Sequence, residues 1–162
     1  MTTNVDPSSI QPSPPVAAAR VIVCERSGRW AVALGRELAD VGIRVYETRT
    51  LADCRQLLGE APASFAVVEL TAQGAEGLLG ELAEQGREFP LARVAVVAER
   101  SLAGYQWLMR EAGAVHFTCS PRRLGPLARL VCRHLAQVPA PPQSLTERIW
   151  TSLPWKEAEA HR

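Results

Sequence analysis

The chain has 162 residues and a formal net charge of +1, and 47% of its residues are hydrophobic. This length fits one domain with flanking tails, and the apolar fraction is enough for a sizeable core. A net charge so near zero gives no global attraction to nucleic acid. No apolar stretch is long enough to span a bilayer, and residues 1–15 lack the basic and apolar segments of a signal peptide. We therefore expect a cytoplasmic protein that has neither nucleic acid nor a membrane as a partner.

Composition divides the chain into four segments. Residues 1–18 are rich in Pro, Ser and Thr and have no apolar periodicity, which predicts a disordered tail. Residues 19–137 form the predicted folded domain, and the Pro-rich run 138–143 predicts a stiff linker. Residues 144–162 form a C-terminal tail, which opens with the capping-box pattern Ser144-Leu145-Thr146-Glu147 and so predicts a short amphipathic helix.

Inside the predicted domain, five β-rich runs alternate with helical patterns. The runs are predicted strands at residues 20–24, 44–47, 64–70, 94–98 and 115–119, of which the second is polar enough for a sheet edge. Apolar residues at helical spacing mark the helices between and after them: Trp30, Leu34, Leu38 and Val41; Leu51 to Leu58; Leu78, Leu79 and Leu82; Leu102, Tyr105, Leu108, Met109 and Ala112; and Leu127, Leu130, Val131 and Leu135. Five βα units with continuously apolar strands predict an α/β fold, a three-layer doubly wound sandwich around a five-stranded parallel sheet.

Polar residues follow four of the predicted strands, at the edge of the sheet where sites form in such folds. These strand ends are Cys24-Glu25-Arg26, Glu69-Leu70-Thr71, Ala98-Glu99-Arg100 and Cys119-Ser120-Pro121. The sequence therefore predicts that any chemistry takes place at this edge.

The order and lengths of the elements, together with these strand ends, resemble the response-regulator receiver family over about residues 20–137. The resemblance implies a flavodoxin-like, receiver-like fold. It also implies that five residues occupy the family's phosphoacceptor pocket: Cys24 and Glu25 in place of two acidic residues, Glu69 in place of the phosphorylated Asp, Ala98 in place of Thr or Ser, and Ser120 in place of Lys.

The departures from that pattern predict a degenerate member, a pseudo-receiver. Phosphoryl transfer needs a carboxylate nucleophile and a metal ion held by acidic oxygens. Here Cys24 leaves one acidic residue of two, Ala98 has no hydroxyl, and Ser120 carries no positive charge. Glu69 is one methylene longer than Asp, and such transfers depend on positioning to within about an ångström. We therefore expect no catalytic residue, no metal site, no cofactor and no enzymatic activity.

Three interpretations of the retained acidic residues remain open at this point. Glu25 and Glu69 are solvated residues at strand ends, or Glu69 imitates a phosphorylated Asp, or the two carboxylates keep a residual divalent-metal site.

The leading functional hypothesis is a protein-interaction module of bacterial signalling that is not phosphorylated in the usual way. One alternative is an atypical receiver that is phosphorylated on Glu69. Another is a small α/β enzyme with Cys24 as its nucleophile, although all four cysteines lie among apolar residues, as buried structural cysteines do.

Several residues indicate a protein partner. Trp107 lies off the apolar stripe of the fourth helix, so we expect it to be exposed. In receivers this helix belongs to the output face. A homodimer through the fourth helix, the fifth strand and the fifth helix is one use of that face.

The tail adds large apolar residues, which are either a docking peptide for a partner or a segment that folds back on its own domain: Ile149, Trp150, Leu153 and Trp155. Arginines around the last helix form either a solvated face or a contact with an acidic partner: Arg122, Arg123, Arg129 and Arg133.

Overall fold

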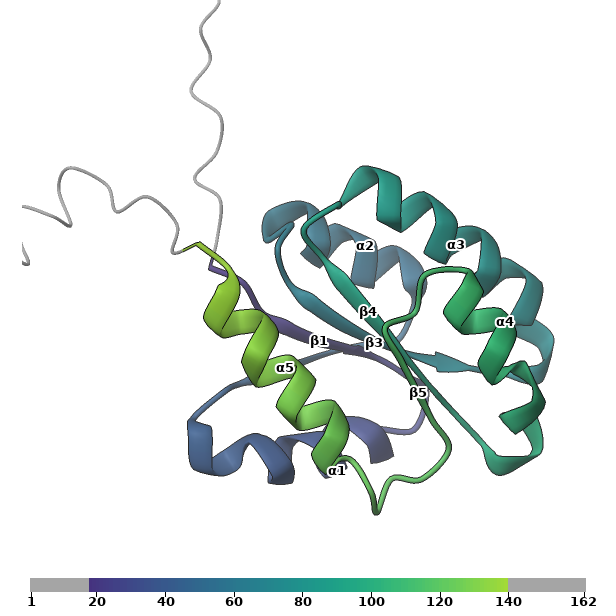
Figure 1. The fold of residues 1–162 in the computed structure, drawn as a ribbon, viewed down its shortest axis with the longest axis horizontal. Helices are drawn as coiled ribbons and strands as arrows, with labels where there is room; N and C mark the ends of the chain where they lie inside the picture. Colours follow the sequence, from purple (N-terminus) through teal and green to yellow (C-terminus); the bar gives the residue numbers. More distant parts are fainter. Residues whose placement is uncertain (1–17, 140–162) are drawn as a thin grey trace, which may run out of the picture.

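The structure is a computed structural model and describes residues 18–139. Its five strands form one parallel sheet in the order β2-β1-β3-β4-β5 (Figure 1). The strands are β1 (Val21–Cys24), β2 (Val45–Thr48), β3 (Phe65–Leu70), β4 (Arg93–Ala98) and β5 (His116–Thr118). The α-helices are α1 (Arg29–Leu38), α2 (Leu51–Glu60), α3 (Ala75–Glu88), α4 (Gln106–Glu111) and α5 (Gly125–Gln137). The predicted doubly wound α/β fold is confirmed, with β2 at one edge of the sheet.

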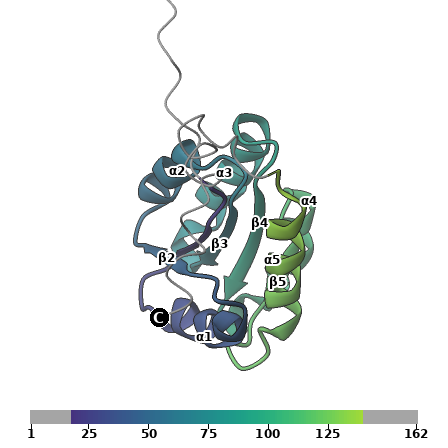
Figure 2. The ribbon, with the colours of Figure 1, turned by 90° about the vertical axis from the view of Figure 1, so that its left-hand side faces the viewer.

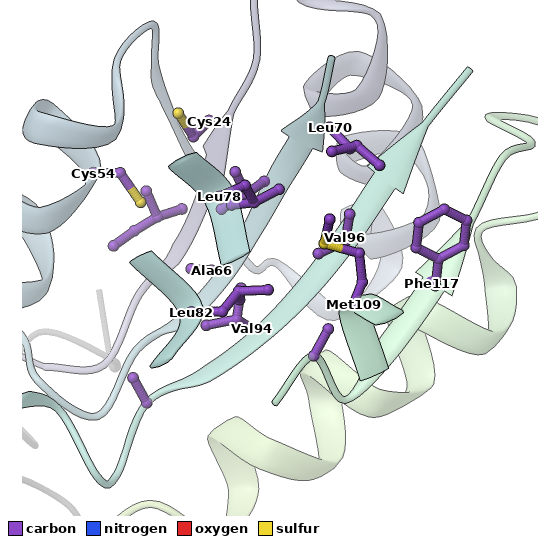
Figure 3. Close-up of a cluster of buried hydrophobic side chains, with 14 of the residues drawn as sticks. Cys24, Cys54, Ala66, Leu70, Leu78, Leu82, Val94, Val96, Met109 and Phe117 are labelled. Carbon is purple, nitrogen blue, oxygen red and sulfur yellow. The ribbon is translucent and has the colours of Figure 1, made fainter. Parts of the chain in front are cut away.

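The helices cover both faces of the sheet, and each face has its own core (Figure 1). Alternate strand residues point to opposite faces. Ile22, Ala66 and Val96 accordingly pack with α2, α3 and α4, in the cluster that Figure 3 shows. Val23 and Val67 pack with α1 and α5 on the other face. Strands that are buried on both faces explain why the sequence shows continuous apolar runs.

The fourth helical region differs from its prediction. It consists of a 3-10 helix, η4 (Arg100–Tyr105), followed by the six-residue α4. A 3-10 helix has about three residues per turn, so a stripe counted at 3.6 residues per turn changes face between the two segments. Met109 is fully buried, whereas Tyr105 and Leu108 are exposed, which makes the predicted five-residue stripe wrong in part. The prediction that Trp107 is exposed is confirmed, because 71% of its surface is accessible.

Val41 is also misplaced by the sequence pattern. The helix α1 ends at Leu38, and a 3-10 turn, η2 (Ala39–Val41), follows it. This change of winding leaves Val41 exposed, whereas Trp30, Leu34 and Leu38 are buried as predicted. A third short 3-10 helix, η3 (Ala72–Gly74), connects β3 to α3.

The start of β1 and the end of α5 lie side by side, away from the carboxyl ends of the strands (Figure 1, Figure 2). The predictions for the N-terminal tail, for most of the linker and for Ile149, Trp150, Leu153 and Trp155 in the C-terminal tail lie outside the described residues. Within residues 18–139, no helix has the length and apolarity that a membrane crossing needs.

Candidate functional site

The carboxylate of Glu25 closes the amino end of α1 from inside the protein. Its Oε2 accepts the backbone N–H of Trp30 at 3.0 Å, and its Oε1 accepts that of Ala31 at 2.6 Å. The Ser27 hydroxyl donates to Oε2 at 3.3 Å. The first N–H groups of a helix have no partner within the helix, and the helix dipole favours negative charge at that end. Glu25 thus satisfies two helix donors with a charge that the dipole stabilises.

The backbone around Glu25 is held so that its side chain can reach back to the helix. The Glu25 N–H donates to the carbonyl oxygen of Thr48 at 3.1 Å, and the Arg49 guanidinium donates to the Glu25 carbonyl oxygen at 3.2 Å. The chain then turns at Gly28, whose φ of 82° lies in the left-handed region. Glycine adopts that conformation without a steric penalty, so this turn depends on the absence of a side chain.

Burial of Glu25 corrects one expectation from the sequence. The residue is 2% exposed and is the one charged residue in the buried class within residues 18–139, so it is not a solvated strand-end residue. A buried carboxylate is costly unless its oxygens are hydrogen-bonded, and the amino end of α1 supplies those bonds.

Glu69, at the end of β3, is held by three donors from the β1–α1 segment. Its Oε2 accepts the backbone N–H of Arg26 at 3.0 Å. Its Oε1 accepts the Arg29 guanidinium and the Trp30 indole N–H, each at 3.3 Å. Only 10% of the Glu69 side chain is exposed, so the expectation of a solvated residue is wrong here as well. Glu69 connects the central strand of the sheet to the start of α1.

Arg29 is the cation that pairs with Glu69. Its guanidinium forms an ion pair with Glu69 at 3.3 Å and lies 5.2 Å from the ring centroid of Trp30. A second ion pair, with Glu99 at 3.6 Å, involves a carboxylate whose side chain is 65% exposed. An exposed pair of this kind contributes about 0–1 kcal/mol. The contact with the mostly buried Glu69 is therefore the one that defines the position of Arg29.

Cys24, which the sequence resemblance matched to an acidic residue, lies in surroundings that disfavour a thiolate nucleophile. Burial is the main cause that raises the pKa of its thiol, and nearby carboxylates add to the effect while Thr48 opposes it. Burial also raises the pKa of Cys54 to about 12, and both residues belong to the same apolar cluster (Figure 3). The thiolate is the reactive form, and these surroundings disfavour it. The geometry gives no support to an enzyme that uses Cys24.

The two remaining positions that the resemblance assigned to the pocket, Ala98 and Ser120, have uncharged side chains. Ala98 is fully buried at the end of β4. Ser120 is half-buried in the loop after β5, where its backbone N–H donates to the Thr118 hydroxyl at 3.3 Å. The structure thus places all five predicted positions at the carboxyl edge of the sheet, while the direct contacts in the site are made by Glu25 and Glu69.

Open hollows lie around the Glu69–Arg29 pair at this edge. One, of about 490 Å³, lies between Ser27, Thr71 and Ser101, and another, of about 360 Å³, lies between Ala98 and Pro121. Arg29 lines both of these hollows. A further hollow, of about 300 Å³, is lined by Cys24, Glu25 and Glu69.

The residues present do not fit the divalent metal that the receiver resemblance implies. Both oxygens of Glu25 accept helix N–H groups, Cys24 has a raised thiol pKa, and Glu69 is already paired with Arg29. A hard cation requires several free oxygen ligands. Within residues 18–139, no three His, Cys, Asp or Glu residues are grouped so that they would hold a metal ion. A residual metal site formed by Glu25 and Glu69 is thus not supported.

Arg29 and the indole of Trp30 are the functional contacts that the sequence pattern did not reveal. Trp30 carried a signal only as an apolar residue of the first helix, and it is indeed 1% exposed. Its polar edge, however, reaches Glu69, which is 39 residues away in the chain. A local pattern does not encode a contact at that separation.

Comparison with known proteins identifies the fold. No protein-family model matches the chain, and no curated protein matches it in sequence. A response regulator from Thermotoga maritima is similar in structure, with a TM-score of 0.61 and 21% identity over 75% of this chain and 100% of that chain. A CheY-like protein, TadZ, from Pseudomonas aeruginosa has a TM-score of 0.59 and 17% identity over 78% of this chain and 100% of that chain.

A third similar structure is an atypical orphan response regulator that is described as having a phosphorylation-independent regulatory mechanism. It has a TM-score of 0.60 and 17% identity over 75% of this chain and 98% of that chain. Because several receivers match over most of the chain, this protein has the receiver fold, as the sequence resemblance predicted.

The role of Glu25 predicts the effect of a nearly isosteric change. In Glu25→Gln, one carboxylate oxygen becomes an amide NH₂ that faces a backbone donor, so a buried N–H loses its acceptor. We expect the free energy of unfolding to fall by about 1–3 kcal/mol in chemical denaturation. The control is Glu47→Gln, because the Glu47 side chain is 42% exposed and pairs only with Arg49 among the described residues. Its expected effect is within about 0.5 kcal/mol, and equal effects of the two changes would contradict the capping role.

The raised thiol pKa of Cys24 predicts slow alkylation in the native protein. With limiting iodoacetamide at pH 8, peptide mapping by mass spectrometry should show Cys24 and Cys54 labelled far more slowly than after unfolding in urea. The half-buried Cys132 serves as an internal comparison. Preferential labelling of Cys24 under native conditions would revive the thiol-enzyme hypothesis.

Proposed function

We propose that this protein is a phosphorylation-independent interaction module of bacterial signalling, with the receiver fold, a cytoplasmic location and no catalytic activity. The observation that carries the proposal is the hydrogen bonding of Glu69, whose two oxygens accept hydrogen bonds from Arg26, Arg29 and Trp30. A receiver nucleophile must present a free carboxylate oxygen to the phosphodonor. In this protein both Glu69 oxygens are engaged.

The proposal gives Glu69 the role of a permanent anion in a fixed site. By the resemblance, Glu69 stands where a receiver acquires negative charge on phosphorylation. Arg29 neutralises that carboxylate from within the protein, at 3.3 Å. The pocket thereby holds both the charge and its counter-charge without a metal or a phosphoryl group. The similar orphan regulator with a phosphorylation-independent mechanism is consistent with this proposal.

The proposed partner is a protein, which binds through α4, β5 and α5, with Trp107 at the centre of the contact. Trp107 is 71% exposed, and aromatic side chains dominate the energetics of protein interfaces. A homodimer through the same three elements is the form of this proposal in which the partner is a second copy. The C-terminal tail, with Ile149, Trp150, Leu153 and Trp155, is proposed as a second contact with the partner.

The engaged oxygens of Glu69 predict that the protein does not accept a phosphoryl group. After incubation with Mg²⁺ and acetyl phosphate, the intact mass should be unchanged, and Mg²⁺ alone should leave the melting temperature unchanged. Glu69→Ala is the matched control, because it removes the one candidate acceptor. A stoichiometric phosphoryl adduct that disappears in Glu69→Ala would overturn the proposal and would support the atypical phosphorylated receiver.

The proposed role of the tail predicts a separation of binding from stability. Trp150→Ala with Trp155→Ala should remove the complex with a partner purified from the native cell while the melting temperature of the free protein stays constant. If the two indoles instead pack on their own domain, the same change should cost on the order of 3–5 kcal/mol for a fully buried aromatic. A clear fall in the melting temperature would therefore refute the docking-peptide proposal.

A further inference from the structure

An open hollow with two arginines in its walls lies at the amino ends of the strands, away from the strand ends that the receiver resemblance singled out (Figure 1). Its volume is about 380 Å³, and its walls come from the segments that lead into β1 and β2 and from the last turn of α5. Its polar wall consists of Arg20, Arg44 and Tyr46, and its largest apolar groups are Ile43 and Leu135. We call it the Arg20–Arg44 hollow.

The register of the sheet brings the two arginines together. Val21 on β1 pairs with Val45 on β2. The residues directly before this pair, Arg20 and Arg44, therefore stand side by side at the amino ends of two neighbouring parallel strands. Residues two apart along a strand share a face, which places Tyr46 on the same side as Arg44. Each guanidinium accordingly lies 5.2 Å from the centroid of the Tyr46 ring, so that one ring carries two cations.

Arg20 is held in position through its backbone and its side chain. Its backbone N–H donates to the Ser64 hydroxyl at 2.9 Å, and its carbonyl oxygen accepts the N–H of Phe65 at 2.8 Å. Its Nη1 forms an ion pair with Glu60 at 2.8 Å, and 23% of the side chain is exposed. A guanidinium has five N–H donors, so the pairing with Glu60 leaves others free to bind a ligand. The Arg20 guanidinium is thus fixed in place before any ligand binds.

The charges around the hollow are unequal within the described domain. Glu60 is the carboxylate that pairs with Arg20, whereas Arg44 is exposed and forms no ion pair with a residue in the range 18–139. No acidic residue lines the hollow. Like charges that stand side by side on neighbouring strands repel each other. An anion between the two guanidiniums replaces that repulsion by attraction, so the arrangement favours a negatively charged ligand.

We propose that the Arg20–Arg44 hollow binds a small organic phosphate, a phosphate monoester whose apolar part lies against Ile43 and Leu135. The planar fork of a guanidinium donates pairs of hydrogen bonds to phosphate oxygens. A phosphate monoester carries a charge of about −1.5 to −2 at pH 7, which suits two guanidiniums better than the single charge of a carboxylate does. Apolar walls with a few polar groups are typical of small-molecule sites. The inference is independent of the proposed function, because the hollow and Glu69 lie at opposite ends of the strands.

Titration of the full-length protein with phenyl phosphate tests the proposal, with binding followed in ¹H–¹⁵N NMR spectra at constant ionic strength. The backbone signals of Arg20, Arg44 and Tyr46 should shift and reach saturation. Inorganic phosphate lacks the apolar ring and should bind about tenfold more weakly. Benzoate keeps the ring but brings a single charge to the two guanidiniums, so it should also bind more weakly than phenyl phosphate.

Two variants at exposed positions should change the affinity for phenyl phosphate in opposite directions. Arg44→Gln removes one cation and should weaken binding at least about tenfold. Glu60→Gln removes the carboxylate that competes for Arg20 and should strengthen binding about threefold. Arg100→Gln is the matched control, because Arg100 is exposed at the carboxyl end of β4 and should leave the affinity unchanged. Melting temperatures show that the variants fold, and Glu60→Gln tests the site by itself if Arg44→Gln is destabilised.

Several results would overturn the proposal. Shifts that do not saturate, an affinity that Arg44→Gln leaves unchanged, and equal affinities for phenyl phosphate and inorganic phosphate would each do so. Benzoate that binds as tightly as phenyl phosphate would also overturn it and would reassign the hollow to carboxylates. A phosphoryl adduct on Glu69 would overturn the proposed function alone and would leave the result for the Arg20–Arg44 hollow intact.

Discussion

The buried carboxylate of Glu25 is the contact on which the geometry of the site depends. A carboxylate taken out of water must be hydrogen-bonded, and the amino end of α1 is a partner with free N–H groups and a favourable dipole. Glu25 satisfies the N–H groups of Trp30 and Ala31, and it thereby determines where the helix begins. Arg29 and Trp30 lie in the first turn, so the same contact positions the side chains that hold Glu69.

The two carboxylates of the site are consequently hydrogen-bonded by the protein's own groups. In the receiver pattern, acidic residues and a lysine surround a metal and a phosphoryl group. Here one acidic residue caps a helix, and a guanidinium from that helix pairs with the carboxylate at the end of β3. Cys24, Ala98 and Ser120, which the sequence resemblance assigned to the same pocket, are compatible with this arrangement, because none of them adds a charge that would need a further partner.

Most of the exposed large apolar side chains lie on elements that do not carry Glu25, Arg29 or Glu69. Those three residues belong to β1, α1 and β3 or directly follow them, whereas Tyr105, Trp107, Leu108 and Val115 belong to η4, α4 and the segment before β5. Arginine is concentrated in that part of the chain, and acidic residues are concentrated in the remainder of the described domain. A weak ion pair connects the two regions: Arg29, which pairs with Glu69, also contacts Glu99, the residue directly before η4.

The sequence by itself determined the α/β fold, the position of β2 at a sheet edge, the placement of Glu25 and Glu69 at the carboxyl ends of strands and the exposure of Trp107. These features follow from the apolar runs that mark strands, from the spacing of apolar residues that marks helices, and from the order of these elements along the chain. All three are properties of the sequence that folding does not alter. Tertiary structure decided the rest. Whether Glu25 and Glu69 were solvated depended on the amino end of α1, and the partners of Glu69 lie about 40 residues away in the chain. The face of α4 depended on a 3-10 segment, which changes the residues per turn and so moves Tyr105 and Leu108 to the surface. Hydrogen-bond partners across strands are set by packing, and no spacing within a single segment encodes them.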